Sequence, residues 1–151
     1  GNLGGLVGAD SLCTAVATDA GLSGTYRAWL GDSTSGPLNR FTQSTRPYYN
    51  VTGLRIANNW ADLTDGTLQN ALFATEQGIA AGASAPWSSV FISGATVGAQ
   101  NCSGWTTSAN SGTAATAGRF AISPSSTDTW TFDNNSIGPC SVTHRLMCFQ
   151  Q

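Results

Sequence analysis

Residues 8–30 read GADSLCTAVATDAGLSGTYRAWL, and this stretch contains one expected helix followed by one expected strand. Five apolar residues recur at the helical period and predict a stripe that faces the core: Leu12, Cys13, Val16, Ala17 and Ala20. Asp10 is placed to cap the start of this helix, and Gly21 supplies the left-handed residue that commonly ends one. Because Cys13 belongs to the stripe, we expect its disulfide to cross into the core. The following residues, 25–30, are rich in aromatic and β-forming types and predict a strand.

Farther along the chain, the signals are shorter. Residues 60–63 predict a second helix, because Asn59 followed by Asp62 resembles a capping box. Asp65 and Gly66 supply the turn that follows it.

The second half of the chain predicts strands separated by long loops. Residues 90–92 form an apolar run suited to a central strand, and residues 145–149 should form the last strand. Between them, residues 93–135 are crowded with Gly, Ser, Thr, Ala and Asn, which favours loops with at most short strands. The sequence therefore predicts one α+β domain over residues 1–151, with more strands than helices.

Composition excludes several classes of partner. The chain has 151 residues, of which 40% are hydrophobic and only 9% charged, and its net charge is −2. This balance gives no electrostatic reason to expect nucleic acid or an acidic membrane as a partner. No apolar run reaches the roughly 18 residues that span a bilayer. We therefore expect no membrane span and no nucleic-acid ligand.

Four cysteines are present, and no two of them form a CxxC pair. This spacing fits zinc poorly and two disulfides well, with four buried free thiols in a cytosolic protein as the alternative. Disulfides persist in oxidising compartments. We therefore expect a secreted protein, located outside the cell or on its surface.

The residues around the cysteines closely resemble those of the endostatin domain of collagens. The match begins in residues 8–30 and continues at Trp60–Leu63 with Gly66, Val90–Phe91 with Gly94, Cys102 with Trp105, Cys140, and Leu146–Cys148. A bacterial domain family of endostatin-like surface lipoproteins is more similar still, through GNLGGL at 1–6, NNWADLTDG at 58–66 and CFQQ at 148–151. The resemblance covers nearly the whole chain, and residues 67–88 and 106–135 match poorly.

The resemblance implies a C-type-lectin-like (endostatin-like) fold. Such a fold would have two helices, a twisted and mostly antiparallel sheet, a long loop region and two nested disulfides, Cys13–Cys148 and Cys102–Cys140. The outer bridge would close nearly the whole chain and the inner one would clamp the loop region. Each would contribute roughly 3–5 kcal/mol on the chain-entropy model.

Catalytic chemistry has few candidates in this sequence. The chain has one His, no Lys and a single Glu, and disulfides would use all four cysteines. Acid–base and nucleophilic catalysis need such groups in a positioned set. His144 adjoins the expected last strand and is interpreted as structural. We expect neither an enzyme nor a bound cofactor.

Metal binding is not expected either. Calcium prefers six to eight oxygens with several carboxylates, and the loop triplets of calcium-dependent lectins are absent. Residues 130–135, WTFDNN, resemble a second lectin motif only loosely, because their spacing to Cys140 is too long. They are interpreted as an Asx-rich turn. The zinc-binding histidines and clustered heparin-binding arginines of collagen endostatin are also missing.

The first functional hypothesis is an extracellular binding or adhesion module for a protein or glycan ligand, because bacterial relatives of the resembled family act as adhesins. Trp and Phe dominate binding hot spots. The candidate ligand-binding residues are Trp87, Trp105, Trp130, Phe132, Asp133 and Asn134. Core packing is the alternative for the aromatic residues: it is favoured for Trp105 and stays open for Trp130 and Phe132.

The second hypothesis is a structural subunit of an extracellular or surface assembly that binds copies of itself. Low charge and a surface of small polar residues suit repetitive packing. In the resembled family a strand before the GNLGG segment pairs with the closing strand, and we expect that strand to be missing from residues 1–151. The closing strand should then keep one open edge, to be filled by an upstream part of the precursor or by a strand from a neighbouring subunit.

Overall fold

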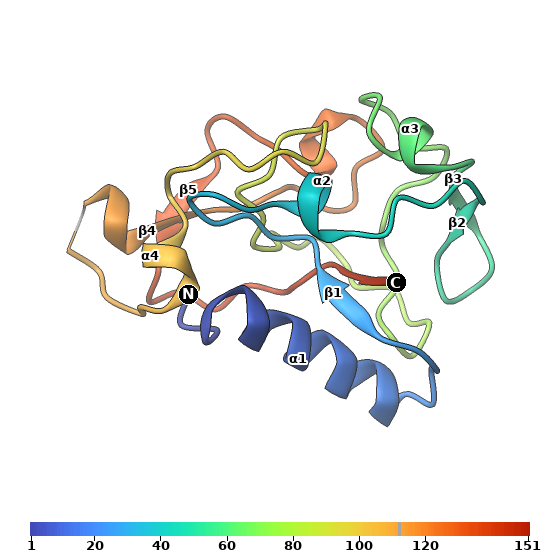
Figure 1. Ribbon diagram of the computed structural model, residues 1–151, viewed down its shortest axis with the longest axis horizontal. Coiled ribbons are helices and arrows are strands. Elements are labelled where there is room, and N and C mark those ends of the chain that lie inside the picture. Colours follow the sequence, from blue (N-terminus) through green and yellow to red (C-terminus); the bar gives the residue numbers. More distant parts are fainter. Residues whose placement is uncertain (112) are drawn as a thin grey trace.

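The computed structural model describes residues 1–111 and 113–151 as a mixed α/β fold (Figure 1). In this part of the chain, four helices, two 3-10 turns and three two-stranded antiparallel sheets are connected by long loops. The elements are α1 (Gly5–Asp19), β1 (Tyr26–Ala28), α2 (Pro37–Arg40), β2 (Tyr48–Tyr49), β3 (Arg55–Ala57), α3 (Trp60–Leu63), α4 (Cys102–Trp105), η1 (Ala114–Thr116), β4 (Ala117–Arg119), η2 (Asp128–Trp130), β5 (Ile137–Pro139) and β6 (Cys148–Gln150). No helix among the described residues is long and apolar enough to cross a membrane.

Helix α1 begins six residues earlier than predicted, since its N-cap is Gly4 and not Asp10. Gly4, with a φ of 75°, precedes the first helical residue, so the assignment of Asp10 as the N-cap is wrong. The Asp10 side chain lies mid-helix and binds Arg40 instead. At the other end the prediction is confirmed: Gly21 has a φ of 73°, and it and Leu22 donate to the last free carbonyls in a Schellman motif.

The buried stripe of α1 is narrower than its apolar pattern suggests. Ala9, Cys13 and Ala17 are buried, whereas Leu12 and Val16 are 48% and 40% exposed. Small residues on this stripe let the helix lie close to β1 and β6, and that close approach leaves the larger flanking side chains outside. The prediction that Leu12 and Val16 face the core is therefore wrong.

The strands are shorter and more scattered than predicted. Strands β1 and β6 pair antiparallel, as do β2 with β3 and β4 with β5. Residues 90–92 form no strand, because only Val90 pairs, in a single bridge to Thr96. The expected twisted sheet is thus replaced by separate ribbons, and the expectation of only two helices is also wrong. Many buried backbone groups are instead satisfied by side chains and turns.

The β1–β6 ribbon separates two hydrophobic clusters. Trp29 packs into the larger cluster with residues such as Ile56, Leu63 and Trp130, whereas Ala28 and Leu30 pack into the second cluster with α1. Successive side chains of an extended segment point to opposite faces, so this stretch contributes to both clusters. In Figure 1, α1 lies along one side of the molecule and the long loops lie on the other.

Two disulfides join Cys13 to Cys148 and Cys102 to Cys140, which are the pairings that the resemblance implies. Cys13 is fully buried, so its bridge runs between the second hydrophobic cluster and β6. Two disulfides fit a protein of an oxidising compartment.

Candidate functional site

Three of the aromatic residues predicted to bind a ligand lie in the core. Trp87, Trp105 and Trp130 are each at most 1% exposed. The indole N–H of Trp105 donates to the carbonyl of Gly31 at 2.7 Å, and the ring of Trp130 lies 4.8 Å from that of Trp29. Large rings remove the most apolar area from water. Core packing, the alternative that the sequence favours for Trp105, is therefore correct for all three, and the hypothesis that they form an exposed binding face is wrong.

Phe132 is partly exposed and pairs with a residue that is not among the predicted ligand-binding residues. Its ring centroid lies 4.9 Å from that of Phe91, which is 40% exposed. The two residues come from loops about 40 positions apart, so their proximity depends on the tertiary fold. The apolar run of residues 90–92 predicts a strand at Phe91. The turn signal of Ser93 and Gly94 directly after it could have placed it on a loop instead.

A buried arginine fixes the loop that carries Phe132. Arg119, in β4, is only 6% exposed and lies 5.0 Å from the Phe132 ring centroid. Its guanidinium donates to the carbonyls of Asp133 at 2.7 Å and Asn134 at 2.9 Å. Burial lowers the pKa of Arg119, and the nearby Asp133 carboxylate opposes this change. The buried guanidinium thus fixes the backbone of the loop at Asp133 and Asn134.

The Asp133 carboxylate stabilises the same loop through hydrogen bonds to the residues that follow it. It accepts hydrogen bonds from the Ser136 hydroxyl and from the Asn135 backbone N–H, and these lower the pKa of Asp133. The bond to Asn135 is the Asx turn that the sequence predicts. Asn134, which follows in the same loop, is exposed. We call Phe91, Arg119, Phe132, Asp133 and Asn134 the loop surface.

The two edges of the β1–β6 ribbon differ in how they are satisfied. On the outer edge of β1, the Thr14 hydroxyl bonds to both the N–H and the C=O of Tyr26. The next outward N–H, that of Ala28, donates to the Asp10 carboxylate, and Arg40 donates to the Ala28 carbonyl. Side chains thus close this edge completely.

The outer edge of β6 has no such closure. The Trp29 N–H donates to the Met147 carbonyl and the Gln151 N–H donates to the Thr25 carbonyl. These two bonds show which residues of β6, in alternation, point their backbone groups toward β1 and which point them away. By that alternation the N–H and C=O groups of Cys148 and Gln150 point away from β1. Both residues are exposed, and within the described chain no backbone hydrogen bond reaches these groups. This side of the ribbon is therefore an open strand edge.

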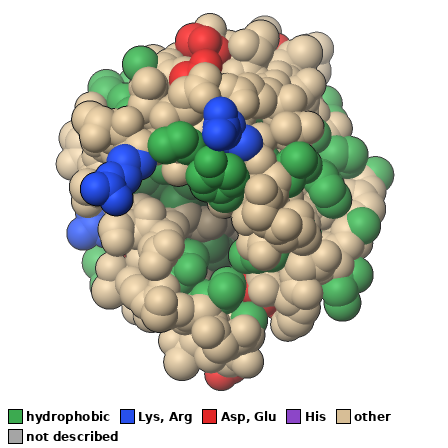
Figure 2. Space-filling view, turned by 90° about the vertical axis from the view of Figure 1, so that its right-hand side faces the viewer, with side chains coloured by type: hydrophobic (Ala, Val, Ile, Leu, Met, Phe, Trp, Pro, Cys, Tyr) green, Lys and Arg blue, Asp and Glu red, His purple; other side chains and the backbone are tan. Residues whose placement is uncertain are grey.

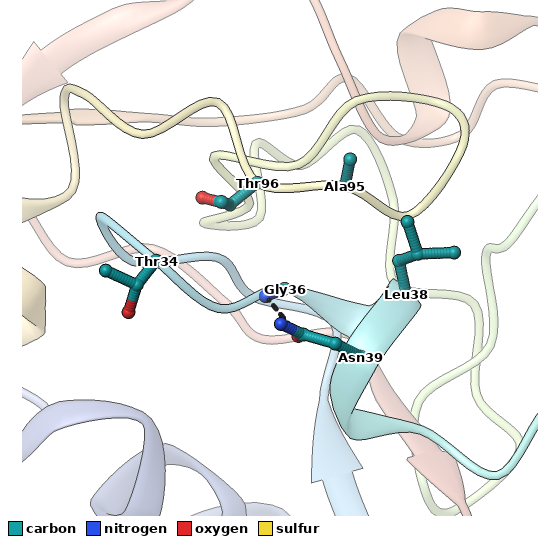
Figure 3. A pocket seen from close by; sticks show the side chains of 6 residues that line it. All are labelled: Thr34, Gly36, Leu38, Asn39, Ala95 and Thr96. Atoms are coloured by element: carbon teal, nitrogen blue, oxygen red, sulfur yellow. Dashed lines mark hydrogen bonds between the residues drawn. The ribbon is translucent and has the colours of Figure 1, made fainter.

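Two clefts flank the segment that contains α2. The smaller, about 150 Å³, is lined by Thr34, Gly36, Leu38, Asn39, Ala95 and Thr96. Figure 3 shows Leu38 and Ala95 at one end of it, and the Gly36 N–H bonded to the Asn39 side chain. The larger, about 310 Å³, is lined by Gln43, Ser44, Thr45, Asn59, Trp60 and Ala61. The face bordered by α3 and β3 is mostly uncharged and hollowed near its centre (Figure 2).

Among the described residues, no group of three or more His, Cys, Asp or Glu side chains could hold a metal ion. A comparison with models of known protein families finds no match, and a comparison with curated proteins finds none either.

Proposed function

We propose that the protein is an extracellular binding or adhesion module of the C-type-lectin-like (endostatin-like) type, without catalytic activity. It recognises a protein or glycan ligand through the loop surface and needs no calcium to do so. The observation that carries this proposal is the pair of partly exposed rings, Phe91 and Phe132, of which Phe132 lies on a loop that hydrogen bonds of Arg119 and Asp133 hold in place. Aromatic anchors on a pre-organised backbone lose little entropy on binding.

The test is a matrix-protein and glycan array probed with the purified domain, with and without EDTA. For any ligand found, Phe132→Ala and Phe91→Ala should each weaken binding about tenfold or more, as hot-spot truncations do. Arg119→Lys should weaken it too, because lysine lacks the planar guanidinium that lies over the Phe132 ring and donates to the Gln100 side chain as well as to the loop carbonyls. EDTA should change nothing.

Val7→Ala is the matched control, because Val7 is 78% exposed on α1 and belongs to neither loop. It should bind like the unaltered protein. If all three loop-surface variants keep full affinity, or the arrays show no ligand, this proposal is wrong.

A second candidate function is a structural subunit that receives a strand from a neighbouring copy. The open edge of β6 favours it, since unpaired strand edges readily add another strand. The contrast with β1, whose outer edge is capped by Thr14, Asp10 and Arg40, adds support.

Gln150 offers a clean test of strand addition, because its N–H points away from β1. Gln150→Pro removes that donor while leaving the β1 ladder intact, and Gln150→Thr is the matched control that keeps it. If subunits pair through β6, light scattering should show self-association that the proline variant abolishes and the threonine variant retains. A protein that stays monomeric at every concentration would exclude this candidate.

A further inference from the structure

The larger cleft combines one aromatic wall with uncharged polar side chains. Trp60 forms the apolar wall, and Gln43, Ser44, Thr45 and Asn59 contribute amides and hydroxyls. None of the lining residues is charged. Small-molecule sites combine an apolar or aromatic lining with a few polar groups that fix orientation, and they begin at roughly 300 Å³. A cleft of about 310 Å³ meets that description for one small ligand.

The aromatic wall is held in place from several sides. The Trp60 ring lies 5.8 Å from that of Trp29 and 6.4 Å from that of Phe41, and its backbone N–H donates to Ser44. The ring also rests on Gly94, where an added Cβ would lie 3.0 Å from it. Trp60 therefore needs no rearrangement to present its remaining surface to the cleft.

The two amides are oriented by internal hydrogen bonds. The Asn59 carbonyl oxygen accepts from the Asp62 N–H at 3.0 Å, and the Gln43 amide nitrogen donates to the Leu38 carbonyl at 2.9 Å. Each bond occupies one end of its amide. In the described chain no partner is bonded to the other ends, so Asn59 offers a fixed donor and Gln43 a fixed acceptor. Thr45 adds a hydroxyl that has no internal partner there.

We propose that this cleft binds a neutral sugar ring, such as a terminal unit of a glycan. A sugar presents an apolar C–H face, which suits the Trp60 wall, and a rim of hydroxyls, which suits donors and acceptors of fixed position. The uncharged lining gives no preference for an acidic or basic ligand. This site is separate from the loop surface, so the inference stands even if the loop surface binds nothing.

The test is NMR titration of the intact domain with methyl glycosides of glucose, galactose, mannose and N-acetylglucosamine. At least one should saturably shift the Trp60 indole N–H and the Asn59 side-chain amide, with a Kd on the order of 1 mM, as suits one small ligand. Glucuronic acid should bind no better than its neutral counterpart. EDTA and Phe132→Ala should leave the shifts unchanged, which separates this site from the loop surface.

Ala61→Tyr should abolish the shifts, because Ala61 is an exposed lining residue and a tyrosine there would fill the cleft. Ala15→Tyr, at an exposed position of α1, is the matched control and should bind normally. Thr45→Val, which removes only a hydroxyl, should weaken binding by about fivefold, the usual effect of one hydrogen bond. No saturable shift with any neutral glycoside, or shifts that survive in a folded Ala61→Tyr variant, would overturn the proposal.

Discussion

Asp10 illustrates how one side chain can hold three segments together. Its carboxylate accepts from Arg40 at 2.7 Å and from the Ala28 backbone N–H at 2.9 Å, so α1, β1 and α2 meet at this residue. The ion pair is only partly exposed, with side-chain accessibilities of 24% for Asp10 and 13% for Arg40. Exposed ion pairs contribute little to the free energy of unfolding, whereas losing a partner of a partly buried hydrogen-bonded pair costs more.

We expect Asp10→Ala to lower the free energy of unfolding by about 2 kcal/mol, since it leaves the Ala28 N–H without its acceptor and the Arg40 guanidinium without its carboxylate. Urea denaturation measures this change. Asp19→Ala is the control, because Asp19 is exposed at the end of the same helix. If the two variants lower the free energy of unfolding equally, the contacts of Asp10 do not stabilise the fold.

His144 couples the stability of the protein to pH. Its ring stacks on Phe120 at 4.8 Å and meets Trp87 edge-on at 4.2 Å. Burial lowers the pKa of His144 below its usual 6.5, only partly opposed by the bond to the Ala85 carbonyl. The folded state therefore prefers the neutral ring.

Because the unfolded chain takes up this proton more readily, stability should be full above the usual histidine pKa and fall as the pH drops through it. Urea midpoints compared at about pH 7.5 and about pH 5.5 should show this loss, a window above the titration of ordinary carboxylates. His144→Phe, which keeps the stacking but cannot be protonated, should flatten the dependence. An unchanged slope in that variant would contradict the assignment.

Among the elements, the ends of α1 show what local sequence can and cannot predict. Gly21 was assigned correctly because a left-handed residue after a helix is a local requirement. Asp10 was assigned wrongly because its partner, Arg40, lies 30 residues away. The same limit applies to Phe91 and Phe132, which tertiary packing alone brings together. Residues 60–63 form the predicted helix because Asn59 accepts from Asp62, a contact within one turn.

At the C-terminus of α1, two substitutions of Gly21 should destabilise the protein to different extents. An added Cβ at Gly21 would meet no atom within 4 Å, so the only cost of a side chain there is its φ of 73°. Gly21→Ala should therefore lower the melting temperature, with a loss of about 1 kcal/mol. Gly21→Asn should lose less, because Asn tolerates the left-handed region. Alanine and asparagine variants of equal stability would rule out backbone strain as the cause.

For the whole molecule, the two disulfides take the place of an extended sheet. The ribbons contain only two or three residues per strand, and a two-stranded ribbon alone is marginal in water. Cys13–Cys148 closes a loop of 135 residues and Cys102–Cys140 one of 38. On the chain-entropy model they contribute about 5 and about 4 kcal/mol, which is comparable to the whole stability of many domains.

The two bridges should nevertheless differ in how easily they are reduced. Cys148 is exposed on β6, whereas Cys102 and Cys140 are both fully buried. Thiol–disulfide exchange requires access to a sulfur atom. Under native conditions, dithiothreitol followed by alkylation and peptide mapping should therefore label Cys13 and Cys148 first. Cys102 and Cys140 should be labelled only as the chain unfolds, so urea should accelerate their reduction strongly and that of the outer bridge only weakly. If Cys102 and Cys140 are labelled first without denaturant, the burial of the inner bridge does not protect it.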